Sequence, residues 1–116
     1  MLGNKKKVDI NMITAEIVDE TKRLLKEEVY KIMLYGSYAR GDFNSESDID
    51  IIIILNCSKG KVSGYRKEIS RVASRVGLKN DIEISLLLRD RDTFEQGQKV
   101  IPFYKNIQKE GIALYG

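Results

Sequence analysis

Histidine is absent from the 116-residue sequence, and cysteine and proline each occur only once. Without histidine, the chain cannot carry a Ser-His-Asp triad, a Cys-His pair or a histidine-ligated zinc site. The single cysteine, Cys57, excludes an internal disulfide and predicts a reducing compartment. Any chemistry must therefore use carboxylates, lysine, arginine, hydroxyl groups and bound metal.

Long hydrophobic runs are also missing. The longest one, residues 49–55, has the length of a strand and is interrupted by Asp50, so we expect no membrane span. The sequence does not open with a signal peptide, which predicts a cytoplasmic protein. The balance of 42% hydrophobic and 32% charged residues is that of a globular chain, and the length predicts one domain over residues 1–116.

The excess of positive charge is small, because 20 Lys and Arg residues are set against 17 Asp and Glu residues. Much of the net charge of +3 comes from Lys5, Lys6 and Lys7 near the chain start. A solvated tail is the simpler interpretation of this run, because no basic–aromatic pattern accompanies it. The sequence therefore gives no reason to expect a nucleic-acid partner.

The spacing of apolar residues predicts helices alternating with strands. Helices are expected over 11–28 with Asn11 as N-cap, over 65–76 with Gly77 as the stop, from a capping box of Asp92 and Glu95, and from Pro102 to Gly111 with Phe103 and Ile107 on one side. Strands are expected over 29–35, 47–55, 81–88 and 112–115, and a loop over 56–64. This order predicts an α/β or α+β fold, with a small mixed β-sheet flanked by helices.

A glycine-serine turn follows the first expected strand. Gly36 lets the backbone approach a ligand closely, and free N–H groups at the start of a helical turn attract phosphate. The Ser37 hydroxyl adds a further donor. Arg40 offers a fixed positive charge, or it pairs with Asp42 or Glu46 and braces the loop.

Two aspartates open the second expected strand. Side chains alternate along a strand, so Asp48 and Asp50 point to one face while Ile49 and Ile51 point to the other. Two carboxylates this close to apolar residues are costly unless a cation neutralises them. Hard oxygen ligands of this kind suit magnesium, which binds through few carboxylates together with substrate phosphates.

A further acid is available on the third expected strand. Two-metal phosphoryl transfer needs another carboxylate, and both Asp81 and Glu83 are placed to supply it. Glu83 is preferred because it lies between Ile82 and Ile84, where an acid is harder to explain structurally. Asp81 stays the alternative, since it also fits a solvated strand start.

This pattern resembles the signature of a known superfamily. Gly36-Ser37, ten further residues and Asp48-Ile49-Asp50 match the spacing of the DNA-polymerase-β-like nucleotidyltransferases. The fuller stretches Gly-Ser-Tyr-Ala-Arg-Gly and Ser-Asp-Ile-Asp are similar to its minimal nucleotidyltransferase branch, as is the segment 103–112. The resemblance implies the polymerase-β-like nucleotidyltransferase fold.

The resemblance also implies roles for particular residues. Asp48, Asp50 and Glu83 would be catalytic and would hold two magnesium ions, while Gly36 and Ser37 would bind the triphosphate of ATP. Arg40 is a candidate for the same phosphates. Glu83 departs from the family, whose third acid is usually aspartate, and its extra methylene would shift or weaken one metal.

Finally, the resemblance implies a partner. Minimal nucleotidyltransferases are paired with small helical HEPN toxins and act as antitoxins by transferring AMP to a tyrosine of the toxin. Two alternatives stay open: an antitoxin that only masks its partner and does not catalyse, and a small-molecule enzyme of the aminoglycoside type. The last would need a homo-oligomer to build its pocket, because the chain has no second domain.

Overall fold

The computed structural model describes residues 8–116, so the Lys5–Lys7 run lies outside the described residues. In chain order the elements are α1 (Ile10–Leu25), the 3-10 helix η1 (Lys26–Glu28), β1 (Val29–Tyr35), α2 (Ser37–Arg40), β2 (Ile49–Leu55), α3 (Lys59–Asn80), β3 (Ile84–Asp90), α4 (Arg91–Val100), α5 (Pro102–Glu110) and β4 (Ile112–Tyr115).

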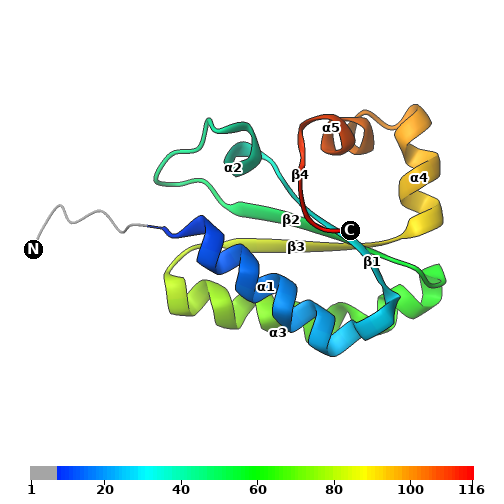
Figure 1. Cartoon of the computed structure of the whole chain (residues 1–116), viewed down its shortest axis with the longest axis horizontal. Coiled ribbons are helices and arrows are strands. Elements are labelled where there is room, and N and C mark those ends of the chain that lie inside the picture. The colour runs from blue at the N-terminus through cyan, green and yellow to red at the C-terminus, as the bar shows by residue number, and fades with distance from the viewer. Residues whose placement is uncertain (1–7) are drawn as a thin grey trace, which may run out of the picture.

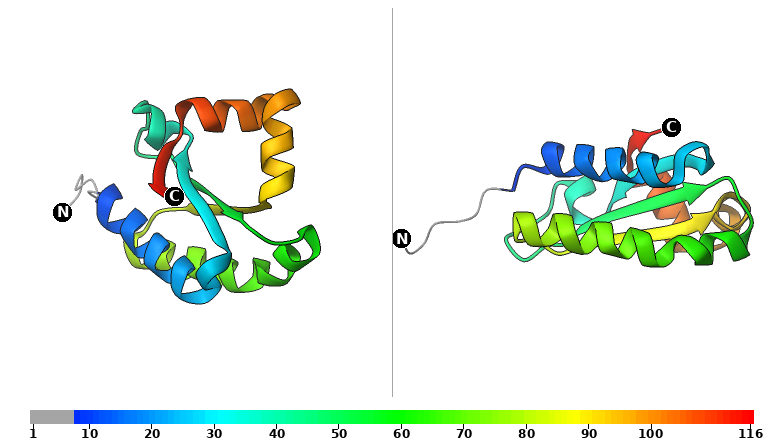
Figure 2. Two further views of the ribbon diagram at one scale, coloured as in Figure 1. Left: turned by 45° about the vertical axis from the view of Figure 1, so that its right-hand side comes forward. Right: turned by 90° about the horizontal axis from the view of Figure 1, so that it is seen from below.

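The strands form one mixed sheet in the order β3-β2-β1-β4 (Figure 1). β2 runs parallel to β3, and α3 supplies the crossover that a parallel pair requires. β1 runs antiparallel to both β2 and β4. Helices α1 and α3 cover one face of the sheet, and α4 and α5 cover the other (Figure 2). The predicted fold class, a small mixed sheet flanked by helices, is confirmed.

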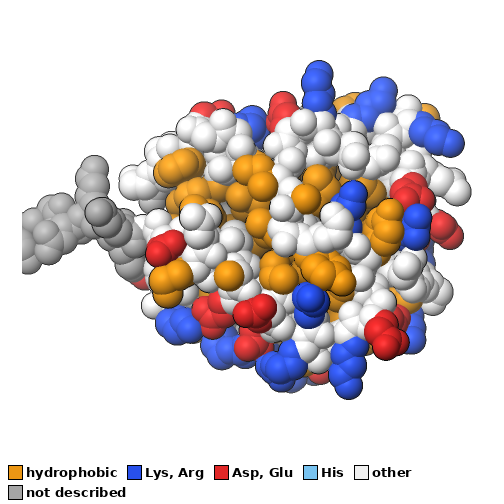
Figure 3. Space-filling view, viewed as in Figure 1, with side chains coloured by type: hydrophobic (Ala, Val, Ile, Leu, Met, Phe, Trp, Pro, Cys, Tyr) orange, Lys and Arg blue, Asp and Glu red, His pale blue; other side chains and the backbone are white. Residues whose placement is uncertain are grey.

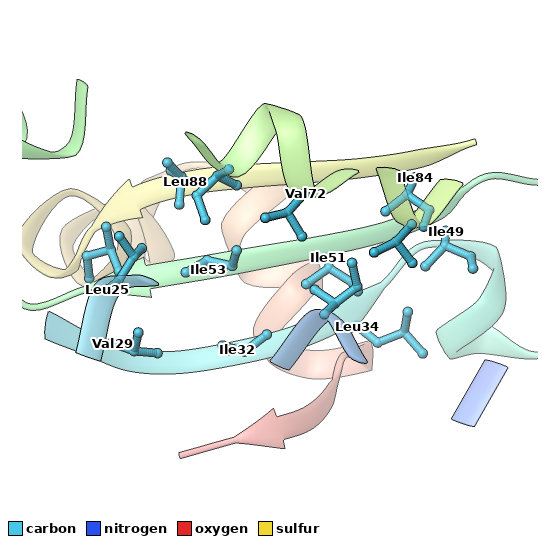
Figure 4. Packing of buried hydrophobic residues seen from close by; sticks show 14 of the residues in the cluster. Leu25, Val29, Ile32, Leu34, Ile49, Ile51, Ile53, Val72, Ile84 and Leu88 are labelled. Atoms are coloured by element: carbon cyan, nitrogen blue, oxygen red, sulfur yellow. The ribbon is translucent and has the colours of Figure 1, made fainter. Parts of the chain in front are cut away.

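The central strand β2 is buried on both of its faces, as its isoleucine run predicts. Ile49, Ile51 and Ile53 point into the larger core beneath α1 and α3 (Figure 4). Ile52 and Ile54 point into the smaller core beneath α4 and α5. Because side chains alternate along the strand, Asp50 lies on the same face as this smaller core.

Three predicted helix boundaries are wrong, because capping side chains set them. Asp9 rather than Asn11 caps α1, accepting a hydrogen bond from the Met12 amide. The expected loop 56–64 is largely helical: Ser58 caps α3 by accepting from the Lys61 amide, and the helix begins at Lys59 despite its glycines. Asp90, not Asp92, caps α4 through the Thr93 amide.

Gly77 does not end α3, as its position suggested. The helix continues to Asn80, and Asp81 follows in a left-handed conformation with φ +53°. A Cβ atom at Gly77 would lie 2.7 Å from the Ile82 carbonyl oxygen, so glycine here allows the chain to pass close to the helix. Asp81 therefore belongs to the helix end, and β3 begins only at Ile84.

The buried side of α5 differs from the expected one. Pro102 opens α5 and Gly111 follows its end, as predicted. The buried pair, however, is Tyr104 and Ile107, whereas Phe103 is 44% exposed. Phe103 instead projects toward the end of β1, which brings it to the site described below.

Within residues 8–116, no helix combines the length and apolarity needed to cross a membrane. Some large apolar side chains are nevertheless exposed, including Met12 of α1 and Ile112 of β4. Figure 3 shows apolar side chains gathered at the centre of one face, with charged side chains around them.

Candidate active site

The Gly-Ser turn is pressed against Asp50. Gly36 has φ +76° and ψ −157°, a conformation that essentially only glycine adopts, and it precedes the single-turn helix α2. A Cβ atom at this position would lie 2.5 Å from Oδ2 of Asp50. The register explains the contact, because Tyr35 is the cross-strand partner of Asp50 and Gly36 comes next. Glycine is thus needed here for both its conformation and its size.

The two aspartates lie together, as the sequence predicts, although Asp48 immediately precedes β2 rather than belonging to it. Burial and the neighbouring Asp48 charge raise the pKa of Asp50 above its usual range, and the Arg40 charge lowers it in part. No hydrogen bond or ion pair within residues 8–116 holds either carboxylate. A pair of carboxylates left in this state favours a bound cation.

Glu83 immediately precedes β3, the strand that pairs with β2. Its carbonyl oxygen accepts a 3.0 Å hydrogen bond from the Ile49 amide, which places Glu83 beside Asp48. Asp50 in turn is the cross-strand partner of Ser85, which therefore lies on the same face of the sheet as Asp50. Glu83 is exposed, and its carboxylate has no fixed partner within the described residues.

The third acid is therefore adjacent to the aspartates but not gathered with them. Among residues 8–116, no three aspartate, glutamate or cysteine side chains are close enough to hold one metal ion between them. Asp48 and Asp50 present the oxygen donors that suit magnesium, and the Arg40 charge offsets the charge of this pair only in part. The donor set fits a hard cation through these two residues, and Glu83 would have to reorient its side chain to join them.

Arg40 braces the turn. Its Nε atom donates a 3.2 Å hydrogen bond to Oδ2 of Asp42, and a guanidinium nitrogen lies 3.9 Å from Oε1 of Glu110 in α5. The pairing with Asp42 is one of the two alternatives that the sequence left open, whereas Glu46 is not involved. The guanidinium is exposed and weakly held, so it stays available to an anion at the turn.

A hollow lies beside the turn, and no pattern in the sequence predicts it. A cavity of about 220 Å³ is lined by Tyr35, Gly36, Arg40, Phe103, Asn106, Ile107 and Glu110. Tyr35 and Phe103 meet edge to face with ring centroids 5.6 Å apart. Burial, and then the Asp50 charge, raise the pKa of Tyr35. The lining residues come from β1, the following turn with α2, and α5, and only the tertiary fold brings α5 to the other two.

The loop between α2 and β2 also presents an aromatic pair. The rings of Tyr38 and Phe43 are stacked, with centroids 4.4 Å apart and planes 11° apart. Tyr38 packs against the larger core, while Phe43 is 51% exposed. Tyr38 therefore covers the turn, and Phe43 is the ring left open to solvent at the edge of the site.

Comparison with known proteins identifies the family model that fits this chain. The model described as a nucleotidyltransferase domain matches residues 14–113. This range contains the Gly-Ser turn, both aspartates and Glu83. The match extends over far more than the short motif, and it includes α3 and both C-terminal helices.

Two curated relatives come from Methanocaldococcus jannaschii, and both are provisionally named protein adenylyltransferases. One is 38% identical over 77 residues, covering 63% of this chain and 76% of the relative. The other is 31% identical over 100 residues, covering 86% of this chain and 92% of the relative. The similarity therefore spans nearly the whole of the second protein.

Solved structures show the same fold at lower identity. A chain from a toxin–antitoxin crystal structure containing AMP-PNP superposes with a TM-score of 0.56 at 20% identity, covering 89% of this chain and 73% of that one. A crystal structure from Sulfolobus solfataricus, provisionally named a nucleotidyltransferase, superposes with a TM-score of 0.52 at 16% identity, covering 99% of this chain and 92% of that one. The fold predicted from the resemblance is confirmed.

Proposed function

The chain belongs to the nucleotidyltransferase domain family and is an enzyme of that type, and from this premise we propose that it transfers AMP from ATP to a hydroxyl group of a partner protein. The observation that carries the proposal is the contact between the Gly36 turn and the Asp50 carboxylate. A triphosphate-binding turn and a cation-binding acid must lie side by side for this chemistry.

In the proposed reaction, the acceptor hydroxyl oxygen forms a bond to the α-phosphorus of ATP. The bond between that phosphorus and the oxygen bridging to the β-phosphate breaks, and pyrophosphate leaves with the bonding electrons. The hydroxyl proton passes to the Glu83 carboxylate, which lies next to Asp48 and has no fixed partner within the described residues. The acceptor thereby becomes a phosphodiester of AMP.

Each residue of the turn has a separate task in this proposal. Ser37 and the backbone after Gly36 hold the phosphates, and Arg40 adds positive charge while keeping α2 fixed to Asp42 and α5. Asp48 and Asp50 would hold Mg²⁺, with Glu83 as the further ligand of a second ion. Bound magnesium neutralises charge that develops on the phosphate oxygens.

The proposed acceptor is a tyrosine of a small helical toxin of the HEPN type, for which this cytoplasmic chain would be the antitoxin. Two observations support a protein acceptor. The curated relatives carry protein adenylyltransferase names, and the AMP-PNP structure is of a toxin–antitoxin complex. The tyrosine and the HEPN type come from the sequence resemblance.

A second candidate function is an antitoxin that masks its partner without catalysis. The observation that favours it is the third acid: Glu83 replaces the usual aspartate, and it does not gather with Asp48 and Asp50 in residues 8–116. The intact pair of aspartates and the glycine turn favour catalysis instead.

The deciding experiment measures the intact mass of the partner. The purified chain is incubated with Mg²⁺, ATP and the protein encoded by the adjacent gene, beside an Asp48→Ala/Asp50→Ala double variant. Asp92→Ala is a matched control, since Asp92 is an exposed acid at the start of α4. We expect one or more AMP increments with the wild type and with Asp92→Ala, and none with the double variant.

Other outcomes have distinct meanings. A stable complex without any mass increment would favour the masking function. Full transfer by the double variant would show that the two aspartates are not the catalytic acids.

A further inference from the structure

Three hollows lie end to end between α3 and the outer edge of β3. The first, of about 650 Å³, includes Glu83 in its lining and shares Ser70 and Ala73 with the second. The second, of about 280 Å³, shares Arg66 and Leu88 with the third, of about 400 Å³. Because neighbouring hollows share residues, they form one continuous groove, here named the β3 groove. Figure 2 shows α3 and β3 running alongside each other along its length.

The β3 groove borders unpaired backbone. β3 is the last strand on its side of the sheet and pairs only with β2 among the described residues. The Glu83 carbonyl oxygen accepts a hydrogen bond from β2, and the pairing of β3 with β2 continues in register. The backbone N–H and C=O groups of every second residue, starting with Glu83, therefore point toward β2. The N–H and C=O groups of Ile84, Leu86 and Leu88 therefore point outward into the groove. A row of such groups is a template for one more strand.

The side chains of the groove suit an extended peptide. Its wall on α3 carries the small residues Ser70, Ala73 and Ser74, which leave room for a backbone to approach. Leu86, only partly buried, supplies an apolar contact on the strand side. Binding by strand addition usually requires a free strand edge and, beside it, room for every second side chain of the bound peptide.

The two ends of the groove differ in charge. Glu83 closes one end, directly beside the candidate active site. Lys59 and Arg66 line the third hollow, and Arg66 also borders the second. Asp90 lines the third hollow too, but its buried carboxylate accepts from the Thr93 amide and interacts with the Lys59 charge. Arg66 has no ion pair with any residue in the range 8–116. A bound segment would thus be matched by a carboxylate side chain at the end farthest from the site.

We propose that the β3 groove binds an extended segment of the acceptor protein as an added strand, with its hydroxyl-bearing residue at the Glu83 end and a carboxylate side chain near Arg66. The segment is about as long as β3, which has seven residues. This inference rests on the proposed transfer of AMP, because it states how the acceptor hydroxyl reaches the reacting phosphate.

The first test needs no known partner. A displayed library of random peptides of seven residues, the length of β3, is selected on the wild-type protein. The enriched peptides are then measured against Ser70→Arg, which fills the middle of the groove, and Ser63→Arg, the same change on the same helix outside it. Both serines are exposed, so neither change should disturb the core.

We expect Ser70→Arg to weaken binding about tenfold or more, as steric blockage of a contact surface does, and Ser63→Arg to leave it unchanged. Amide hydrogen exchange should show protection of Ile84, Leu86 and Leu88 when a selected peptide is bound. An absence of enriched peptides, equal binding by both variants, or unchanged exchange at these three amides would overturn the groove proposal.

The same peptides separate this inference from the transfer activity. Tyrosine or serine is placed at the residue of a selected peptide nearest Glu83, and AMP incorporation is measured by mass with Mg²⁺ and ATP. Groove binding with no incorporation into any such peptide, or into the intact partner protein, would refute the transfer activity while the groove assignment stands. Incorporation into the partner protein by Ser70→Arg at the wild-type rate would refute the groove assignment alone.

Discussion

The two ends of the central strand pair use carboxylates in opposite ways. At the end where β1 begins, Glu28 accepts a 2.5 Å hydrogen bond from the Tyr65 hydroxyl and lies 2.9 Å from Nζ of Lys61. These hydrogen bonds, first from Tyr65 and then from Lys61, lower the pKa of Glu28. At the other end, burial and the Asp48 charge raise the pKa of Asp50.

The difference lies in what surrounds each acid rather than in the acid itself. Oε2 of Glu28 meets the Tyr65 hydroxyl and the Lys61 ammonium group, both on α3, so this acid ties that helix to the start of β1. Its other oxygen, Oε1, is buried without a hydrogen-bond partner among the described residues. Asp50 sits beside another carboxylate and a glycine, which can supply no cation and no side-chain donor. An acid held in this way costs stability and is explained by a ligand that arrives from outside.

The largest effect should come from removing the charge of Asp50. We expect Asp50→Asn to reduce AMP transfer on the order of a thousandfold, as loss of a charge-stabilising group does in other enzymes. In the absence of magnesium the melting temperature should stay the same or rise, because the removed charge is partly buried beside Asp48 and is offset only in part by Arg40. Transfer assays and thermal unfolding in the presence of a chelator measure the two effects. A large fall in stability would mean that Asp50 is structural, like Glu28.

The next effect isolates the glycine that faces Asp50. Gly36→Ala should destabilise the fold by about 1–3 kcal/mol, because the backbone conformation excludes other residues and the new Cβ would collide with Oδ2 of Asp50. It should also lower transfer by displacing that carboxylate. Gly41→Ala is the matched control: Gly41 has φ +88°, but a Cβ there meets nothing within 4 Å.

Gly41→Ala should therefore lose some stability yet keep its transfer rate. Denaturant unfolding and transfer assays on both variants give the comparison. Equal losses of activity in the two would show that strain in the loop, rather than contact with Asp50, limits the enzyme.

A smaller effect is expected for the contact between Tyr65 and Glu28 at the start of β1. Tyr65→Phe removes the hydroxyl that donates to Glu28 and should lower the melting temperature, since the carboxylate loses its first partner. Transfer of AMP should not change, because Glu28 lies at the opposite end of β1 from the Gly-Ser turn. A kinetic defect without a loss of stability would contradict the structural assignment of this cluster.

The smallest effect is the pH dependence of that cluster. The pKa of Glu28 is lowered in the folded protein, so its contribution to stability is present above the unfolded value of about 4.3 and is lost as the pH falls through the lower folded value. Thermal unfolding between neutral and acid pH should show this loss in the wild type. The part of this pH-dependent loss that is absent from the Tyr65→Phe variant is the contribution of the hydrogen bond between Tyr65 and Glu28. Identical profiles would mean that the bond contributes nothing.

Much of the sheet could be predicted from the sequence. The segments that form β1, β2 and β4 are rich in β-branched or aromatic residues and end near glycine or polar residues, which are local properties. The helix starts were less well predicted. Asn11 and Asp92 fit a capping pattern as well as Asp9 and Asp90 do, and the choice depends on where each helix packs. Ser58 lies in the glycine-containing segment 56–64, whose composition favours a loop over the helix that Ser58 caps.

By itself the sequence determined the central strand, the glycine turn and the spacing that places two aspartates on one face. Each depends on residues close together in the chain, whose alternation and turn chemistry need no long-range contact. The tertiary structure alone decided that Asp50 lies against Gly36, that Glu83 stands beside Asp48 without joining it, and that Arg40 reaches Glu110. It also decided that α3 leaves one edge of β3 open. These contacts follow from strand register and helix packing, which are set by the burial of the whole core and are not written in any short stretch of the chain.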